Sequence, residues 1–172
     1  RWNDQLGLTR LRQDREILIR YFLESLSALR ALGEAPGTLL DLGAGAGFPG
    51  LVMKIARPSL KITLVEADGK RVSFLHQIIG LLKLSGIPVF RSPFEQLSGP
   101  AWEERFDLLL TRSLPPELVL EKGRRFLRLG GKALFFQANA RDQEWKDRLQ
   151  AYPGMELEKI EPVKLSLNPE AR

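Results

Sequence analysis

A short apolar segment that leads into closely spaced glycines constrains this 172-residue chain more than any other feature. The segment runs from Leu39 to Gly50 and reads LLDLGAGAGFPG. Glycine adopts positive φ angles at little cost and lets the backbone come close to a ligand. A strand, a glycine-rich turn and a helix start, in this order, form the ligand-binding turn of Rossmann-like α/β units. The segment therefore predicts a nucleotide-type cofactor at the end of a strand.

Residues beside the glycines indicate which cofactor fits. The spacing of Gly45, Gly47 and Gly50 matches the dinucleotide fingerprint, which is typical of nicotinamide and flavin sites. Asp41, however, would repel a pyrophosphate and attract the ammonium and sulfonium groups of S-adenosylmethionine. Pro49 stands at the helix start and lacks the N–H that a phosphate would use. The turn therefore favours S-adenosylmethionine, with a nicotinamide as the remote alternative.

A second acidic residue supports a nucleoside ligand. Glu66 follows the apolar segment Lys61–Val65, which we predict to be the next strand. A carboxylate at this point accepts hydrogen bonds from ribose hydroxyls in both cofactor classes, so Glu66 does not choose between them. A glycine-rich turn without a ligand is the simpler alternative, but it leaves the order of strand, helix and acidic residue unexplained.

Composition limits the available chemistry. The chain has no cysteine and one histidine, which excludes disulfides and cysteine nucleophiles and argues against a histidine-based metal site. A net charge of +5 is compatible with nucleic acid as a partner, although many basic proteins bind none. The sequence contains neither an apolar run long enough to span a bilayer nor a charged start with an apolar h-region. We expect a cytoplasmic monomer with no metal and no membrane contact.

Strand and helix patterns alternate after an amphipathic helix over Gln13–Leu32. We predict strands at 38–42, 61–65, 89–90, 106–111 and 132–136, and helices at 49–56, 70–84, 116–129 and 141–151. A further strand is expected within Glu156–Leu167, as the first of the strand pair that closes the sheet of small-molecule methyltransferases. Such alternation predicts a mostly parallel sheet with helices on both faces.

Ligands of open α/β sheets lie at the carboxyl ends of the strands, so the residues after each strand are the site candidates. These segments are Asp41–Gly50, Glu66–Arg71, Ser92–Glu95, Arg112–Pro115 and Gln137–Asn139.

Three of these regions resemble the bacterial 16S rRNA guanine-N7 methyltransferase G family, also called glucose-inhibited division protein B. They read LLDLGAGAGFPG, VEADGKRVSFLHQI and FDLLLTRS. Near the N-terminus, WNDQLGLT followed by EILIRYFLESL is similar to that family's first helical region. The resemblance implies a Rossmann-like class I S-adenosylmethionine-dependent methyltransferase fold, with an N-terminal helical segment (1–36) and a methyltransferase domain (37–172) in one compact unit. It also implies N7-methylation of a guanine in 16S rRNA of the small ribosomal subunit.

The resemblance also implies individual roles. Gly43 and Phe48 would line the methionine part of S-adenosylmethionine, and Glu66 would hold its ribose. Phe94 and Glu95 would flank the adenine. The full cofactor-binding set that we predict is Asp41, Gly43, Gly45, Phe48, Glu66, Phe94, Glu95 and Arg112.

Arg112 is the candidate catalytic residue, placed by the resemblance where cofactor and guanine meet. An arginine can donate to guanine O6 or to a phosphate. The alternative is an arginine that only forms a salt bridge at a strand end.

Several polar positions of the family are changed in this chain, while the cofactor turn is well matched. The replacements are Gly7 for Asn, Tyr21 for His, Glu24 for Asp, Pro93 for Arg, and Gln137 and Ala138 for a Lys-Gly pair. These positions are expected to face RNA. A methyltransferase on another RNA or a small molecule, or a cofactor-binding relic without transfer activity, therefore stays open as an alternative.

Methylation of guanine N7 suits the side chains available. N7 carries a lone pair and no proton, so the reaction needs in-line placement and no general base. Amino-nitrogen methylation would favour an Asn-Pro-Pro-Tyr type of motif, where this chain has Thr111–Pro115, and carbon-5 methylation of pyrimidines would need a cysteine.

The other basic residues have simpler interpretations. Lys70 and Arg71 belong either to a basic surface near the cofactor or to a solvated helix start, and His76 is expected on a helix surface. The cluster Arg124, Arg125 and Arg128 lies near a predicted helix end, where cations are favoured by the helix dipole.

Overall fold

The computed structural model describes residues 2–29, 33, 37–137 and 140–160. Five parallel strands form one sheet in the order β3-β2-β1-β4-β5. Their bounds are β1 Thr38–Leu42, β2 Lys61–Glu66, β3 Val89–Arg91, β4 Phe106–Thr111 and β5 Leu127–Phe135. The order reverses between β1 and β4, which is the topological switch point where doubly wound sheets bind ligands. The predicted Rossmann-like architecture is confirmed.

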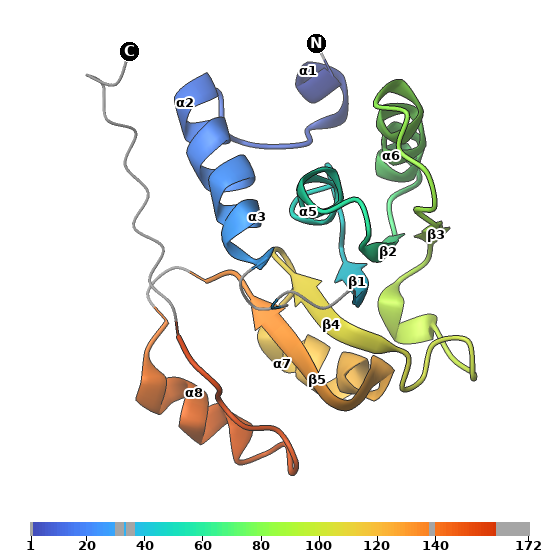
Figure 1. Cartoon of the computed structure of the whole chain (residues 1–172). Helices are drawn as coiled ribbons and strands as arrows, with labels where there is room; N and C mark the ends of the chain where they lie inside the picture. Colours follow the sequence, from blue (N-terminus) through green and yellow to red (C-terminus); the bar gives the residue numbers. More distant parts are fainter. Residues whose placement is uncertain (1, 30–32, 34–36, 138–139, 161–172) are drawn as a thin grey trace.

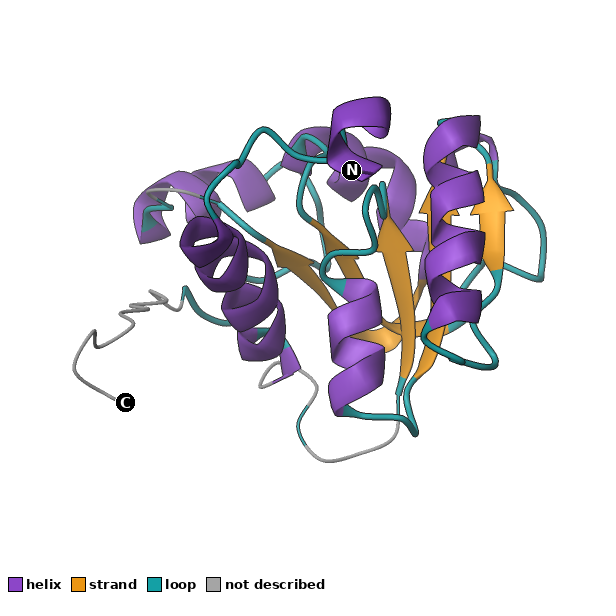
Figure 2. Cartoon of the chain, turned by 90° about the horizontal axis from the view of Figure 1, so that it is seen from above, coloured by secondary structure: helices purple, strands orange, loops and turns teal. Residues whose placement is uncertain are grey.

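Helices cover both faces of the sheet because the buried strands are apolar on both sides. One core joins Leu39, Ile62 and Leu108 to Ala28, which directly follows α3 (Glu24–Ser27), and to α5 (Gly50–Ala56) and α6 (Gly69–Leu81). Figure 1 shows α5 and α6 on this side of the sheet, and Figure 2 shows the helices over the strands from above.

The second core lies on the opposite face. It joins Leu40 and Leu109 to η2 (Phe94–Gln96), η3 (Val119–Gly123) and η4 (Arg124–Phe126). Neighbouring residues of β1 thus point to opposite cores, as strand geometry requires. Two further helices are α7 (Pro116–Leu118) and α8 (Asp142–Leu149).

The N-terminal region is more broken than the predicted helix over 13–32. It begins with α1 (Trp2–Leu6), and then α2 (Asp14–Ile17), the π-helical turn η1 (Leu18–Leu23) and α3 follow one another without a gap. The Ser25 hydroxyl donates to the carbonyl of Tyr21 inside this turn, a type of back-bonding that often bends helices. Residues 30–32 lie outside the described residues.

Three predicted boundaries are wrong by three residues or more, namely the ends of two helices and the start of the strand predicted at 132–136, which begins at Leu127. The helix over 116–129 ends at Phe126, because Leu127 pairs with Phe106 and begins β5. Apolar residues at 127 and 129 continue the helical pattern, yet Leu127 is buried in the sheet while Leu129 is fully exposed on an irregular stretch of β5. The helix over 70–84 ends at Leu81, and Lys83 then takes a positive φ of 52°.

The predicted strand within Glu156–Leu167 is not found in its described part. Residues 156–160 form neither strand nor helix, and residues 161–167 lie outside the described residues. Within the described chain, no helix is long and apolar enough to cross a membrane.

Candidate functional site

The carboxyl ends of three neighbouring strands bring the predicted residues together. Leu42 of β1 pairs with Val65 of β2, and Asp41 pairs with Leu110 of β4. Extending this register by one or two residues places Gly43 between Glu66 and Arg112. The loop after β4 also lies against the glycine turn, since a Cβ at Gly43 would stand 3.2 Å from Leu114 Cγ. Residues far apart in sequence thus share one edge of the sheet.

The glycine turn requires its glycines. Gly43, Gly45 and Gly47 have φ angles of 72°, 55° and 86°, which residues with a Cβ rarely adopt. A Cβ at Gly47 would stand 2.4 Å from Leu51 Cδ1, and one at Gly50 would stand 2.6 Å from Asp41 Oδ2. The turn is therefore packed tightly against the start of α5 and the end of β1.

Asp41 is a buried carboxyl group with no ion pair to any residue that the structure describes. Its side chain is 1% exposed. Burial raises the pKa of Asp41 to about 7, the hydrogen bond from the Gly50 N–H opposes this shift, and the charge of Glu66 adds to it. The Gly50 N–H donates to Oδ2 at 3.0 Å, whereas Oδ1 is buried without a hydrogen-bond partner among the described residues. A cationic ligand beside the turn would satisfy this carboxylate.

Glu66 ties the glycine turn to the start of α6. Its Oε2 accepts the Gly45 N–H at 2.8 Å and its Oε1 accepts the Asp68 N–H at 2.9 Å. Each carboxylate oxygen keeps a lone pair for a further donor such as a ribose hydroxyl. The residue thus shapes the turn and is also suited to hold a diol.

Asp68 caps α6 directly after this contact. Its Oδ1 accepts the N–H groups of Lys70 at 2.7 Å and Arg71 at 3.1 Å, and these hydrogen bonds lower the pKa of Asp68. Lys70 and Arg71 thus lie in the first turn of α6, where their backbone N–H groups bond to the cap, and His76 is exposed further along the helix.

Aromatic rings from the N-terminal helical region cover the glycine turn. The Phe48 ring centroid lies 4.9 Å from that of Tyr21 and 5.1 Å from that of Phe22. Phe48 is half-buried, and Phe22 is 39% exposed. The turn thus has an apolar wall that the glycine motif alone does not predict.

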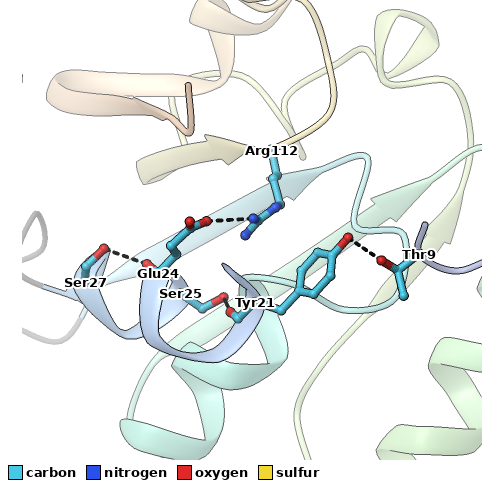
Figure 3. A network of polar contacts seen from close by, with 6 residues as sticks. All are labelled: Thr9, Tyr21, Glu24, Ser25, Ser27 and Arg112. Atoms are coloured by element: carbon cyan, nitrogen blue, oxygen red, sulfur yellow. Dashed lines mark hydrogen bonds and ion pairs between the residues drawn. The ribbon is translucent and has the colours of Figure 1, made fainter. Parts of the chain in front are cut away.

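Arg112 extends from the end of β4 into a network of polar contacts (Figure 3). Its Nη2 donates to Glu24 Oε2 at 2.7 Å, and its Cζ lies 4.5 Å from the Tyr21 ring centroid. The Phe136 ring centroid lies 5.6 Å from the same Cζ atom. Tyr21 is held in turn by Thr9, whose hydroxyl oxygen lies 2.7 Å from the Tyr21 hydroxyl oxygen.

The sequence predicts that Tyr21 and Glu24 face RNA, but it does not predict their shared contact with Arg112. In the structure both residues contact Arg112. Their spacing of three residues predicts a shared helix face, but the partner lies 88 residues further along the chain. Only the tertiary fold reveals the contact.

The other predicted residues differ in their exposure. Phe94 is 4% exposed and packs in the second core, so it has a structural role, and its contact with adenine stays a prediction. Glu95, Pro93 and Gln137 are exposed, and Ala138 lies outside the described residues.

Arg91 is a cation that the sequence analysis did not single out. It ends β3, and its Cζ lies 2.8 Å from where a Cβ at Gly69 would stand. The guanidinium thus covers the first residue of α6, on the Glu66 side of the site. Its position at the end of a predicted strand is the sequence feature that could have identified it as a site candidate.

The basic cluster near the predicted helix end has structural partners. Arg124 donates to the Pro153 carbonyl at 3.3 Å, Arg125 donates to the Leu97 carbonyl, and Arg128 pairs with Asp107. Among the described residues, no group of three or more His, Cys, Asp or Glu side chains could hold a metal ion.

A hollow of about 290 Å³ lies at the opposite end of the sheet from the glycine turn. Its lining includes Lys61 and Thr38 at strand starts and the rings of Phe90 and Trp102. It is separate from the strand ends described above.

Comparisons with known proteins agree with this arrangement. A family model described as rRNA small subunit methyltransferase G matches residues 1–168. The chain is 38% identical over 145 residues to a protein of that name from Roseiflexus castenholzii, covering 83% of this chain and 62% of the relative. It is 34% identical over 154 residues to that of Leuconostoc mesenteroides, covering 87% and 64%. The chain thus spans less than two thirds of the length of these relatives.

Solved structures share the fold at low identity. A SAM-dependent methyltransferase from Aquifex aeolicus aligns with a TM-score of 0.61 at 17% identity, covering 81% of this chain and 83% of that one. The cyclase SpnF aligns with a TM-score of 0.60 at 20% identity, covering 76% and 55%. The fold is therefore that of class I methyltransferases, and the cyclase illustrates that the fold alone does not define the reaction.

Proposed function

The chain belongs to the rRNA small subunit methyltransferase G family, and from this we propose that it transfers a methyl group from S-adenosylmethionine to N7 of a guanine in 16S rRNA of the small subunit. The reaction would take place in the cytoplasm, where subunits are assembled. The observation that carries the proposal is the buried carboxylate of Asp41 beside a glycine turn, with no cation among its described neighbours.

The residues present fit this cofactor. Asp41 would be matched by the positive charge of the methionine part, which would favour the ionised carboxylate that burial disfavours by raising the pKa of Asp41 to about 7. Glu66 would accept the ribose hydroxyls, and the positive φ angles of Gly43 and Gly45 let the backbone approach the ligand. Phe48 and its aromatic neighbours would exclude water from the methionine side.

The mechanism needs placement rather than proton transfer. S-adenosylmethionine, when bound, supplies an electrophilic methyl group that a ring nitrogen with a free lone pair can accept. Arg112 would hold guanine O6 or the adjoining phosphate, because arginine donates to both. Holding the acceptor nitrogen in line with the methyl group is catalysis by proximity and orientation.

Labelled methyl transfer tests the proposal directly. This chain is mixed with labelled S-adenosylmethionine and small ribosomal subunits that lack their native N7 methyl group, and in parallel with free 16S rRNA. We expect incorporation that maps to one guanine N7, and the parallel reaction shows whether the assembled subunit is required. Binding of S-adenosylhomocysteine without any transfer would contradict the proposal and favour the relic, and transfer to another position would favour a different RNA target.

A further inference from the structure

The ion pair between Arg112 and Glu24 lies at the strand ends, where the methyl group would be transferred. Arg112 Nη2 and Glu24 Oε2 are 2.7 Å apart, and the two side chains are 21% and 27% exposed. Figure 3 shows Glu24 reaching Arg112 from the N-terminal helical region, with Tyr21 beside it. Because both groups are largely shielded from solvent, the carboxylate cancels most of the guanidinium's charge in the space around it.

Transfer to N7 changes the charge of the acceptor. The N7 lone pair forms the new N–C bond, the S–C bond breaks with its electron pair going to sulfur, and the positive charge passes from the sulfonium to the purine. A guanidinium that donates to guanine would therefore repel the charge that develops on the same ring. Arginine stays charged at any working pH, so it cannot relieve this repulsion by losing a proton.

We propose that Glu24 is a positioning residue that compensates the charge of Arg112, so that Arg112 can hold the guanine while the guanine becomes cationic. The inference rests on the proposed function. Glu24 fixes the direction of the guanidinium through Nη2, and the Tyr21 ring, 4.5 Å from Arg112 Cζ, presents a face that attracts cations. The Thr9 hydroxyl holds Tyr21 in this place.

This role predicts an effect on chemistry rather than on binding. The charge on guanine develops in the transition state, so loss of compensation lowers kcat and leaves KM nearly unchanged. A residue that only joined the N-terminal region to the domain would instead change thermal stability.

The experiment compares three substitutions in single-turnover methyl transfer to small subunits. Glu24→Gln keeps an acceptor for Arg112 and removes the charge, and we expect a loss of about 10- to 100-fold in rate with KM within about threefold. Glu24→Asp keeps the charge and is expected to restore the rate to within about fivefold of the wild type. S-adenosylhomocysteine affinity and the melting temperature should stay unchanged in both.

Glu117→Gln is the matched control. Glu117 lies on α7 and forms its ion pair with Arg148 of α8 at 2.9 Å rather than with Arg112, so its loss should leave the transfer rate unchanged. A Glu24→Gln variant as fast as the active wild type would overturn this inference alone, as would a variant whose only defect is a lower melting temperature. Absence of transfer by the wild type would overturn the proposed function and this inference with it.

Discussion

Two arginines of this protein have nearly the same surroundings and very different places in the fold. Arg112 lies over the Tyr21 ring at 4.5 Å and pairs with Glu24 at 2.7 Å. Arg148 lies over the Trp145 ring at 4.7 Å and pairs with Glu117 at 2.9 Å. Their side chains are 21% and 20% exposed, and in each the Nη1 atom is buried without a hydrogen-bond partner in the part of the chain that the structure describes.

The similarity teaches that local chemistry does not identify a functional arginine. A cation–π contact, a carboxylate partner and an unpaired N–H occur at both sites. The difference is topological, since Arg112 directly follows β4 beside the glycine turn, whereas Arg148 lies on α8, outside the sheet. Parallel sheets bind ligands at strand ends, so only the first arginine is placed for chemistry.

The largest effect that separates the two sites concerns stability at α8. Trp145 is 6% exposed and its ring lies 5.2 Å from that of Phe135 on β5, so it fastens the helix to the sheet. Trp145→Ala should lower the free energy of unfolding by about 3–5 kcal/mol. Denaturant unfolding measures this loss, and the transfer rate per folded molecule should not change. A slower methyl-transfer rate in fully folded Trp145→Ala protein would show that the Arg148 site is functional, and the contrast between the two arginines would be lost.

Asp41 extends the comparison to a buried carboxyl group that has no ion-pair partner among the described residues. Its pKa of about 7 in the folded protein lies above the ordinary value of 3.8, so the folded state binds more protons than the unfolded state between these values. The contribution of Asp41 to the free energy of unfolding is therefore largest below about pH 4, and it falls as the pH rises to about 7. The loss is up to about 4 kcal/mol, at about 1.4 kcal/mol for each unit of pKa shift.

Asp41→Asn tests this account because it removes the titration. The variant should gain stability relative to the wild type as pH rises from 4 to 7, which thermal unfolding in a pH series would record. Equal pH dependence in both proteins would show that the folded protein keeps Asp41 ionised. Addition of S-adenosylmethionine should reduce the difference, since a cation beside Asp41 would favour its charged form.

Removing each arginine in turn tests the contrast itself. Arg112→Ala should reduce methyl transfer by about 100-fold, because a donor that orients the acceptor is lost. Arg148→Ala should leave transfer within about twofold and lower stability by about 1–2 kcal/mol through the lost packing on Trp145. Steady-state transfer and denaturant unfolding of both variants measure these effects. Comparable transfer by the two variants would contradict the placement of Arg112 at the reaction centre.

The sequence predicted those features of the site that depend on local pattern. The glycine turn, the strand before it and Glu66 follow from spacing and residue type, and the structure brings Asp41, Gly43, Glu66 and Arg112 to one edge of the sheet. The partners of Arg112 could not be predicted, because the contact with Glu24 spans 88 residues and depends on how the N-terminal helical region packs. The predicted end of the helix that begins at Pro116 was wrong for a related reason. Leu127 fits both a helical stripe and a strand, and only its pairing with Phe106 decides between them.

The smallest expected effect concerns the hydroxyl that holds Tyr21. Tyr21→Phe removes the 2.7 Å contact with Thr9 and keeps the ring under Arg112. The expected loss is about 0.5–1.5 kcal/mol in stability, with transfer within about threefold of the wild type. Thr9→Ala removes the same contact from the other side, so the double variant should lose little more than either single one. If Tyr21→Phe slowed transfer as much as Arg112→Ala while Thr9→Ala did not, the hydroxyl would act on the substrate itself. The site would then differ from that of Arg148, where no hydroxyl lies on the ring, in its chemistry as well as in its place.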